Sequence, residues 1–481
     1  MYDELHRPQF HFSPRHSWMN DPNGLVWYRG EYHLFFQHTP GFMNHAANSW
    51  GHAVSADLVH WRELDTAIAP NEYGFIWSGS AVVDTDDSAG FTGGGERALV
   101  AVYTTGGFGA PRPNQPGATP CVQALAYSTD RGRTFRRYSG NPVLGHVRAE
   151  NRDPKVIRHA ATGQWIMALF LDGNDFALYG SPDLKRWRHL CALEVADTGE
   201  CPDLFELPVD GDPGDTRWVF WGAAGVYRLG SFDGTTFTPE TPALRCELGA
   251  NGYAAQTWSD VPTEDGRRIQ ISWMRNGHFP AMPFNGQMSF PVELTLRTTP
   301  QGLRLCRQPV KELELLHRRT LRWQEHRLSP GPNRHDLYHV HGPGWQSRIA
   351  TEYRNLAPDT TWDLFHVEAV IDPGDAAAFG IGVRGHDLRY DVAAARFTWL
   401  GHPFPAPRDG DGCLRLQLLV DRTSLELFAA AGLVSASFCF LPAACDMPLE
   451  LYAEGGSVRL VSLAIHELNS AWPPAAARTG G

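Results

Sequence analysis

The 481-residue sequence lacks several features that would place it quickly in a class of proteins. No run approaches the roughly 20 apolar residues of a membrane-spanning helix, and no long basic run accompanies the formal net charge of −11. The eight cysteines form no Cys-x-x-Cys pair, which argues against a zinc knuckle or a disulfide framework. These absences disfavour a membrane protein, and they disfavour nucleic acid as the main partner.

The amino terminus also lacks a secretory signal. MYDELHRPQF is acidic and polar, whereas a signal peptide begins with basic residues and continues with an apolar segment. We therefore expect a cytoplasmic protein with reduced thiols. An extracellular protein whose leader is missing from this sequence would look the same.

Helical periodicity is scarce over residues 1–295, where short apolar runs take its place. LVWY, YHLFF, ALVAVY and WIMALF are separated by Gly, Asp, Asn and Pro. Such spacing is typical of short antiparallel strands joined by tight turns.

A degenerate repeat runs through this region. SADLVHW at residues 55–61 returns as SPDLKRW at 181–187, and looser copies begin at Ser128 and Ser231. The four starts are 50 to 73 residues apart, a length that suits one four-stranded sheet with its loops. Repeats of this kind predict the blades of a β-propeller, here four or five of them.

The pattern changes near residue 295. The best helix candidate is Val310–Leu316, and alternating strands follow up to the segment Val458–His466. This alternation predicts a β-sandwich of ordinary domain size. The predicted organisation is a propeller over 1–295, a linker with a short helix over 296–318, a β-sandwich over 319–473 and a tail over 474–481.

Three acidic residues lie close to prolines in separate candidate blades. Asp21 lies in NDPNG, Asp153 in NRDPK and Glu200 in GECPD. Taken alone, Asp21 reads as a turn residue, because Asp-Pro and Asn-Gly are common in turns. Carboxylates from different blades could converge at one end of a propeller axis. Such a set suits glycoside hydrolysis, which needs a nucleophile and an acid, while a third carboxylate could stabilise the positively charged transition state.

The blocks WMNDPNG, RDP and ECPDLF, in this order, resemble the signature blocks of glycoside hydrolase family 32, the β-fructofuranosidases. YHLFFQ, WGHAVSADLVHW, SGSAVV, GSFDGTTFTPE, YAAQTW and GQMSFPVELTL resemble that family as well. The likeness covers roughly residues 7–300, and VDRTSLELF and LAIHELNSAW extend it into the carboxy-terminal part. Because the blocks recur in order, the likeness is far more specific than any single motif.

The resemblance implies a five-bladed β-propeller followed by a β-sandwich, and a retaining mechanism without metal or other cofactor. It implies that Asp21 is the nucleophile, Glu200 the acid/base and Asp153 the transition-state stabiliser. The reaction expected is release of terminal, non-reducing fructose from sucrose, fructo-oligosaccharides or fructans.

The resemblance also implies a set of sugar-binding residues. Asn20, Gln37, Ser78, Arg152 and Tyr253 are expected to hydrogen-bond the fructosyl unit or the carboxylates. Tryptophan rings suit sugar C–H surfaces, and the candidates are Trp18, Trp50, Trp77 and Trp273. Cys201 is expected to tune Glu200 rather than attack substrate, because no histidine partner stands nearby.

Four positions depart from the pattern usual in the family: His45, Trp77, Asn251 and Phe284. We expect them to line or border the pocket and to affect the choice of substrate. Two other functions stay open: a fructosyltransferase on the same scaffold, and a fructan-binding protein without activity. The sequence favours a monomer or homodimer and no metal site, since His335, His339 and His341 have no acidic ligands beside them.

Overall fold

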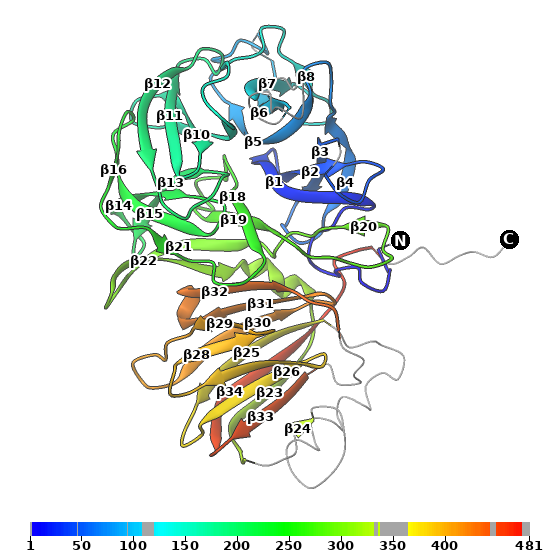
Figure 1. Cartoon of the computed structure of the whole chain (residues 1–481), viewed down its shortest axis with the longest axis vertical. Helices are drawn as coiled ribbons and strands as arrows, with labels where there is room; N and C mark the ends of the chain where they lie inside the picture. Colours follow the sequence, from blue (N-terminus) through cyan, green and yellow to red (C-terminus); the bar gives the residue numbers. More distant parts are fainter. Residues whose placement is uncertain are drawn as a thin grey trace, which may run out of the picture. The chain divides into compact units, whose positions relative to one another are not determined.

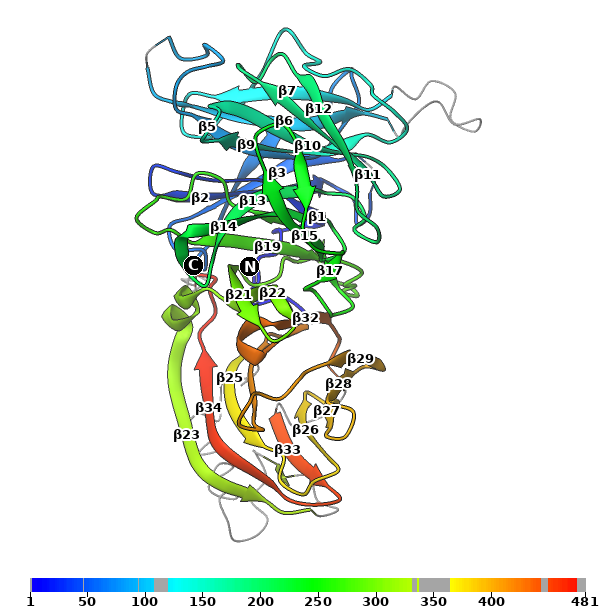
Figure 2. The same cartoon turned by 90° about the vertical axis from the view of Figure 1, so that its left-hand side faces the viewer.

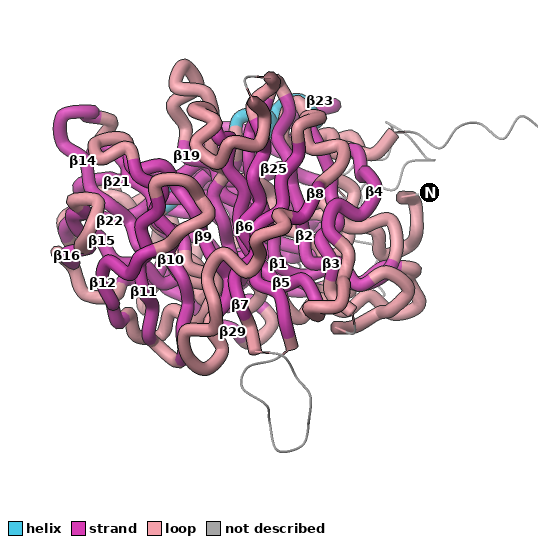
Figure 3. The backbone as a smooth tube through the Cα atoms, turned by 90° about the horizontal axis from the view of Figure 1, so that it is seen from above, coloured by secondary structure: helices cyan, strands magenta, loops and turns pink. Residues whose placement is uncertain are grey.

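The computed structural model describes residues 2–45, 47–93, 95–107, 120–330, 335–336, 364–442 and 449–473. Within these residues the chain is almost entirely strand, with helix limited to two short 3₁₀ segments, Lys311–Leu316 and Ala430–Gly432 (Figure 3). No helix of this described part is long and apolar enough to cross a membrane. The all-β prediction is confirmed.

Residues 11–247 and 251–312 form the first compact unit, a five-bladed propeller. Its sheets fan out around one another in Figure 1, from blue β1–β4 to green β13–β19. The first strands of neighbouring blades pack against one another and so surround the axis. Backbone hydrogen bonds from Trp27 to Ser259 and from Ser259 to Leu25 join the first blade to the fifth.

Each blade is a four-stranded antiparallel sheet, and short strands extend two of them. Blade one contains β1 (Ser17–Tyr28), β2 (Glu31–Thr39), β3 (Ser49–Ser55) and β4 (Arg62–Ile68), with β20 (Phe284–Asn285) added in parallel. Blade two contains β5 (Phe75–Asp84), β6 (Ala98–Gly106), β7 (Val122–Ser128) and β8 (Arg136–Arg137). Blade three contains β9 (Arg152–His159), β10 (Gln164–Asp172), β11 (Asp175–Ser181) and β12 (Arg188–Glu194). Blade four contains β13 (Asp203–Val209), β14 (Asp212–Trp221), β15 (Val226–Phe232) and β16 (Phe237–Pro239), with β17 (Leu244–Arg245) beside β15. Blade five contains β18 (Gly252–Thr257), β19 (Arg268–Met274), β21 (Val292–Thr299) and β22 (Gly302–Pro309).

The sequence repeat marks the same turn in four blades, between the third and fourth strands. In each copy the aspartate accepts hydrogen bonds from backbone N–H groups of its own turn: Asp57, Asp130, Asp183 and Asp233. A side chain that satisfies turn N–H groups in this way fixes a tight turn. The fifth blade turns through Thr299-Pro-Gln-Gly302 instead, so no fifth copy of the repeat is visible in the sequence.

A buried ion pair joins the inner strands of blades three, four and five. Lys155 Nζ lies 3.5 Å from Asp203 Oδ1, and both side chains are almost completely buried. The same ammonium donates to the carbonyl of Thr257 at 2.7 Å, while Asp203 accepts from the backbone N–H of Thr257. Burial lowers the pKa of Lys155, and the charge of Asp203 opposes that shift. The segments RDPK (152–155) and ECPD (200–203) therefore each contain one member of this structural ion pair as well as one candidate catalytic residue.

We expect the Lys155→Met substitution to lower the free energy of unfolding by about 3–5 kcal/mol, because it leaves the Asp203 carboxylate buried without its partner. Denaturant unfolding measures the change. The double variant Lys155→Met, Asp203→Asn removes both charges and should recover part of the loss. Equal stabilities for the wild type and the single variant would show that the pair contributes nothing.

The predicted boundary at residue 295 is wrong by about one hairpin. Strand β21 pairs with β19, and β22 pairs with β21, so both complete blade five. The propeller unit extends to Glu312, and the predicted helix is a 3₁₀ segment with Leu313 and Leu316 buried.

The second unit is a β-sandwich made of two six-stranded sheets. Figure 2 separates the two layers, with β23, β34 and β25 in one and β26, β27 and β33 in the other. Their facing apolar side chains form one core. The first sheet runs β23 (His317–Leu328), β34 (Val458–Leu468), β25 (Phe365–Asp372), β30 (Leu414–Val420), β31 (Ser424–Ala429) and β32 (Val434–Cys439). The second runs β24 (His335–Asp336), β33 (Leu449–Glu454), β26 (Ala378–Val383), β27 (His386–Asp391), β28 (Arg396–Trp399) and β29 (His402–Pro405).

The first ten residues belong to this second unit, not to the propeller as predicted. The carboxylate of Asp421 accepts from the backbone N–H groups of Gln9 and Phe10, at 2.7 and 3.0 Å. The indole of Trp472 donates to the carbonyl of Pro8 and stacks on Tyr2. Contacts across more than 400 residues of sequence carry no local signal, so the sequence pattern could not show them.

Candidate active site

A cavity of about 310 Å³ lies at the axial mouth of the propeller. Its walls bring together the three candidate carboxylates and most of the predicted sugar-binding residues. Those that line it are Asn20, Asp21, Gln37, Trp77, Ser78, Arg152, Asp153, Glu200, Tyr253 and Trp273. His45, Cys121, Glu150 and Arg275 line it as well. Of these four, only His45 was singled out from the sequence.

The five blades each supply a residue from the same end of the first strand. Asp21 lies in β1, Ser78 in β5, Asp153 in β9 and Tyr253 in β18, while Glu200 lies three residues before β13. In a propeller these ends meet around the axis, so residues far apart in sequence become neighbours. The predicted convergence of the three carboxylates is therefore what the structure shows.

Asp21 lies within a strand and not in a turn. Strand β1 runs on to Tyr28, and its pairing with β2 shifts register on both sides of Asn23. The expected turn at Asn23-Gly24 is thus a bulge, which inserts extra residues and re-aims side chains. Gly24 has φ +54°, and a Cβ there would lie 2.6 Å from the ring of Phe35, so the bulge requires glycine.

The backbone at two other site residues occupies the left-handed region. Asp153 has φ +61° and Cys201 has φ +50°. Residues other than glycine rarely adopt this conformation, and it concentrates at functional sites. The proline that follows Asp153 does not hold it extended. Instead, the backbone N–H of Asp153 donates to Thr104 Oγ1 at 3.0 Å, which helps to fix this strained residue.

The carboxylate of Asp21 is held by neutral hydrogen-bond donors. Ser78 Oγ donates to Asp21 Oδ2 at 2.7 Å, and Asn20, itself oriented by the indole of Trp18, contributes a second hydrogen bond. Burial raises the pKa of Asp21, as does the charge of Glu200, whereas the Ser78 and Asn20 hydrogen bonds lower it. These donors favour the ionised form that a nucleophile requires.

Arg152 ties the other two carboxylates together. Its guanidinium forms ion pairs with Glu200 and with Asp153, the latter at 3.5 Å, and donates to Glu150 at 3.0 Å. Burial raises the pKa of Asp153 to about 7, with Arg152 opposing and the charges of Glu200 and Asp21 adding to the shift. The cavity is lined by four carboxyl groups, of Asp21, Glu150, Asp153 and Glu200, and by two guanidinium groups, of Arg152 and Arg275, and carboxylates in this excess suit a cationic transition state.

Glu200 is fixed from two sides. Arg152 donates to Oε2, and the hydroxyl of Tyr253 donates to Oε1 at 3.1 Å. The ring of Tyr253 in turn lies under the guanidinium of Arg275, 4.4 Å from its centroid. Glu200 therefore sits in a defined orientation at the edge of the cavity, as a group that transfers a proton requires.

Cys201 contacts the two aspartates and not Glu200, contrary to the prediction. Its Sγ lies 3.5 Å from Asp153 Oδ2 and 3.7 Å from Asp21 Oδ2. Burial and the three surrounding carboxylates raise the pKa of the thiol well above its usual value. The residue therefore stays an S–H group, which lies between the carboxylates of Asp21 and Asp153.

Four other predicted positions do not line the cavity. The indole of Trp18 donates to Asn20 Oδ1 at 3.0 Å, so Trp18 orients a residue of the wall. Trp50 is completely buried, and its indole donates to the carbonyl of Trp77 at 2.9 Å, so it supports the wall from behind. Phe284 pairs with Ser17 in the added strand and packs on Phe279. Asn251 donates to the carbonyl of Arg275. Trp50 was proposed for its ring alone, and Phe284 and Asn251 because they depart from the family pattern; neither criterion distinguishes a residue that lines the cavity from one that supports the wall.

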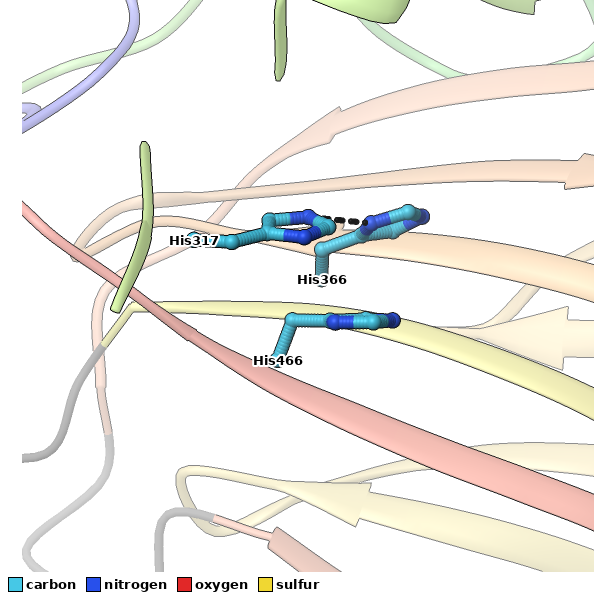
Figure 4. A group of neighbouring side chains, drawn as sticks. All are labelled: His317, His366 and His466. Atoms are coloured by element: carbon cyan, nitrogen blue, oxygen red, sulfur yellow. Dashed lines mark hydrogen bonds between the residues drawn. The ribbon is translucent and has the colours of Figure 1, made fainter. Parts of the chain in front are cut away.

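One group of three histidines in the sandwich has the composition of a metal site: His317, His366 and His466 (Figure 4). The ring of His466 stacks on that of His317, with centroids 4.0 Å apart, and on that of His366 at 5.1 Å. His466 donates to Glu368 and accepts from Thr320. His366 donates to Gln417 and therefore accepts from His317.

These hydrogen bonds occupy ring nitrogens that a metal ion would need as ligands. Burial lowers the pKa of His317 and of His366 from 6.5 to about 4. Of the three histidines considered from sequence, His339 and His341 lie outside the described residues.

We expect the His366→Leu substitution to weaken the dependence of stability on pH. Between pH 6.5 and 4 the unfolded chain binds protons that the folded network excludes, so wild-type stability falls as the pH falls through this window. Urea midpoints recorded from pH 4 to pH 7 test this, with His60→Leu at an exposed propeller turn as the control. Parallel pH curves for the wild type and His366→Leu would contradict it.

Comparison with known proteins gives matches along most of the chain. A sequence model described as "Glycosyl hydrolases family 32 N-terminal domain" matches residues 11–309, and one described as the family 32 C terminal matches residues 345–467. A levanase of Bacillus subtilis is 37% identical over 98% of this chain and 72% of its own length. An extracellular exo-inulinase of Aspergillus ficuum is 30% identical over 98% of this chain and 96% of its own. The crystal structure of an exo-inulinase from Aspergillus awamori superposes with a TM-score of 0.83 at 28% identity, covering 98% of this chain and all of that one.

Proposed function

This chain belongs to glycosyl hydrolase family 32 and is a β-fructofuranosidase-type glycoside hydrolase, and we propose that Asp21, Glu200 and Asp153 carry its reaction. The observation that supports this assignment is the meeting of the three carboxylates in one cavity, each from a different blade. A retaining glycosidase needs a nucleophile and an acid on either side of the scissile bond.

In the first step an oxygen of Asp21 bonds to the anomeric carbon of the fructosyl unit while the glycosidic C–O bond breaks. Glu200 gives its proton to the departing oxygen. Asp153 faces the positive charge that develops on the sugar ring, where it acts electrostatically. In the second step Glu200 takes a proton from water, the hydroxyl attacks the same carbon, and the ester to Asp21 breaks to release fructose.

The size of the cavity supports cleavage of the terminal unit. A space of about 310 Å³ is at the lower limit of ordinary small-ligand pockets and suits one furanose ring and little more. The polymer or the glucose of sucrose then extends outward past His45 and Trp77. Relatives named levanase, exo-inulinase and invertase support fructans and sucrose as the substrate class.

A panel of sucrose, kestose, inulin and levan, incubated with the purified protein, tests this function. Release of free fructose from at least one of them is the expected result. Longer oligosaccharides formed in concentrated sucrose would instead show a fructosyltransferase. Binding of fructan without any product would show the inactive binding protein, and either outcome would end the hydrolase assignment.

The cytoplasmic location and the choice between monomer and homodimer stay predictions. Cell fractionation tests the first, and sedimentation of the purified protein tests the second.

A further inference from the structure

A second cavity, of about 250 Å³, lies beside the active-site pocket in the propeller. The two share walls built from consecutive residues. Cys121 lines the active-site pocket, while Val122 lines the second cavity. On the neighbouring strand Thr105 lines the second cavity, and the next residue, Gly106, accepts a hydrogen bond from the indole of Trp77 at 2.9 Å. The cavities are therefore only a few ångströms of backbone apart.

Exposed aromatic rings lead from one cavity to the other. The ring of Trp77, in the active-site wall, contacts that of Phe75 with centroids 6.2 Å apart. Phe75 is 36% exposed, and Tyr73, at the rim of the second cavity, is 54% exposed. Large apolar side chains that are exposed and lie close together often mark a binding surface.

The lining of the second cavity suits a neutral, hydroxylated ligand. Three tyrosines, Tyr73, Tyr103 and Tyr138, supply apolar faces, and one acidic and one basic residue, Glu72 and Arg137, leave it without net charge. A ring face combined with a few polar groups is the usual chemistry of small-ligand pockets. The lining offers no excess of positive or negative charge that would bind a phosphorylated or otherwise strongly charged ligand.

Thr105 supplies a second observation that points to a ligand. The residue is 5% exposed, and its hydroxyl has no hydrogen-bond partner among the described residues. Its neighbour Thr104, on the opposite face of the strand, is bonded to Asp153 and Gln123. A buried hydroxyl without a partner costs free energy, and a sugar hydroxyl in the cavity would satisfy it.

We propose that the second cavity binds an inner sugar unit of a fructan whose terminal fructose occupies the active-site pocket. This inference rests on the proposed function and extends it, because it names polymeric or oligomeric fructan, as against sucrose, as the substrate that the propeller is built to hold. Tyr73 and Phe75 guide the chain outward from Trp77, and Thr105 hydrogen-bonds the unit that reaches the cavity.

The test compares sucrose, which is too short to reach the second cavity, with levan and inulin. Tyr73→Ala should raise the KM for the preferred fructan about 3- to 10-fold, with kcat and the KM for sucrose unchanged. Tyr73→Phe keeps the ring and serves as the matched control, with a KM near that of the wild type. Thr105→Val should raise the same KM, and Thr105→Ser, which keeps the hydroxyl, should not.

The outcomes separate this inference from the proposed function. A wild type that cleaves no fructoside defeats both. A wild type that cleaves sucrose or fructan, with Tyr73→Ala and Thr105→Val matching it on fructan, overturns only the second site. Equal rises in KM for sucrose and fructan would also overturn it, because they would place the effect in the active-site pocket. Thermal midpoints of all four variants within a degree or two of the wild type confirm that the fold is intact.

Discussion

Replacement of Asp21 by Asn is expected to reduce kcat for fructoside hydrolysis by about four orders of magnitude or more, because it removes the proposed nucleophile from a covalent mechanism. The amide keeps the size of the carboxylate and can still contact Ser78, which donates to Asp21 Oδ2 at 2.7 Å in the wild type. Fold and binding of fructose should therefore survive. Initial rates on sucrose or kestose measure the loss, and binding of fructose by calorimetry shows that the pocket remains.

The matched control is Asp57→Asn. Asp57 also follows a strand and accepts backbone hydrogen bonds within its turn, so this variant loses what a purely structural aspartate supplies. It should affect stability modestly and leave kcat unchanged. If Asp21→Asn retained wild-type activity, or if the two variants behaved alike, Asp21 would be a structural residue and the mechanism would need another nucleophile.

Local patterns predicted much of the fold because propeller blades are built from local pairings. Each blade folds from strands that follow one another in sequence, and the turn aspartates Asp57, Asp130, Asp183 and Asp233 recur at the same place in four of them. The series of alternating strands after residue 295 likewise predicted the β-sandwich. The candidate carboxylates were found because each lies close to a proline, in a block that resembles a signature of family 32.

The features that the sequence could not show depend on contacts between distant segments. The hydrogen bonds of Asp421 to Gln9 and Phe10 assign the first ten residues to the sandwich. Trp50 and Trp77 have the same side chain, yet one supports the wall that the other forms. Cys201 follows Glu200 in sequence, but its left-handed backbone turns the thiol toward the two aspartates. Residue type and order identified most of the residues that line the cavity, but they missed Cys121, Glu150 and Arg275, and they did not show which side chains contact one another.

Replacement of Glu200 by Gln should show the second largest effect, and that effect should depend on the leaving group. General acid catalysis contributes about 10²- to 10⁴-fold. Sucrose and fructans leave as alkoxides unless protonated, so their cleavage should slow by that factor or more. A fructoside whose leaving group departs as a stable anion needs no proton in the first step. With such a substrate, fructosyl transfer to Asp21 should remain fast in the variant. The ester should then accumulate, because the amide that replaces the Glu200 carboxylate cannot take a proton from water in the second step.

Rapid-quench kinetics with both kinds of substrate separate the two steps, and mass spectrometry of the trapped protein should show one added fructosyl group. Tyr253→Phe is the comparison: it removes the 3.1 Å hydrogen bond to Glu200 but keeps the carboxyl, and a lost hydrogen bond to a charged group costs about 1.5–3 kcal/mol, or roughly 10- to 150-fold. If Glu200→Gln slowed both kinds of substrate equally and no adduct formed, Glu200 would only orient Arg152. In that case the proton would come from another group in the cavity, for which Asp153, with its pKa of about 7, is the nearest alternative.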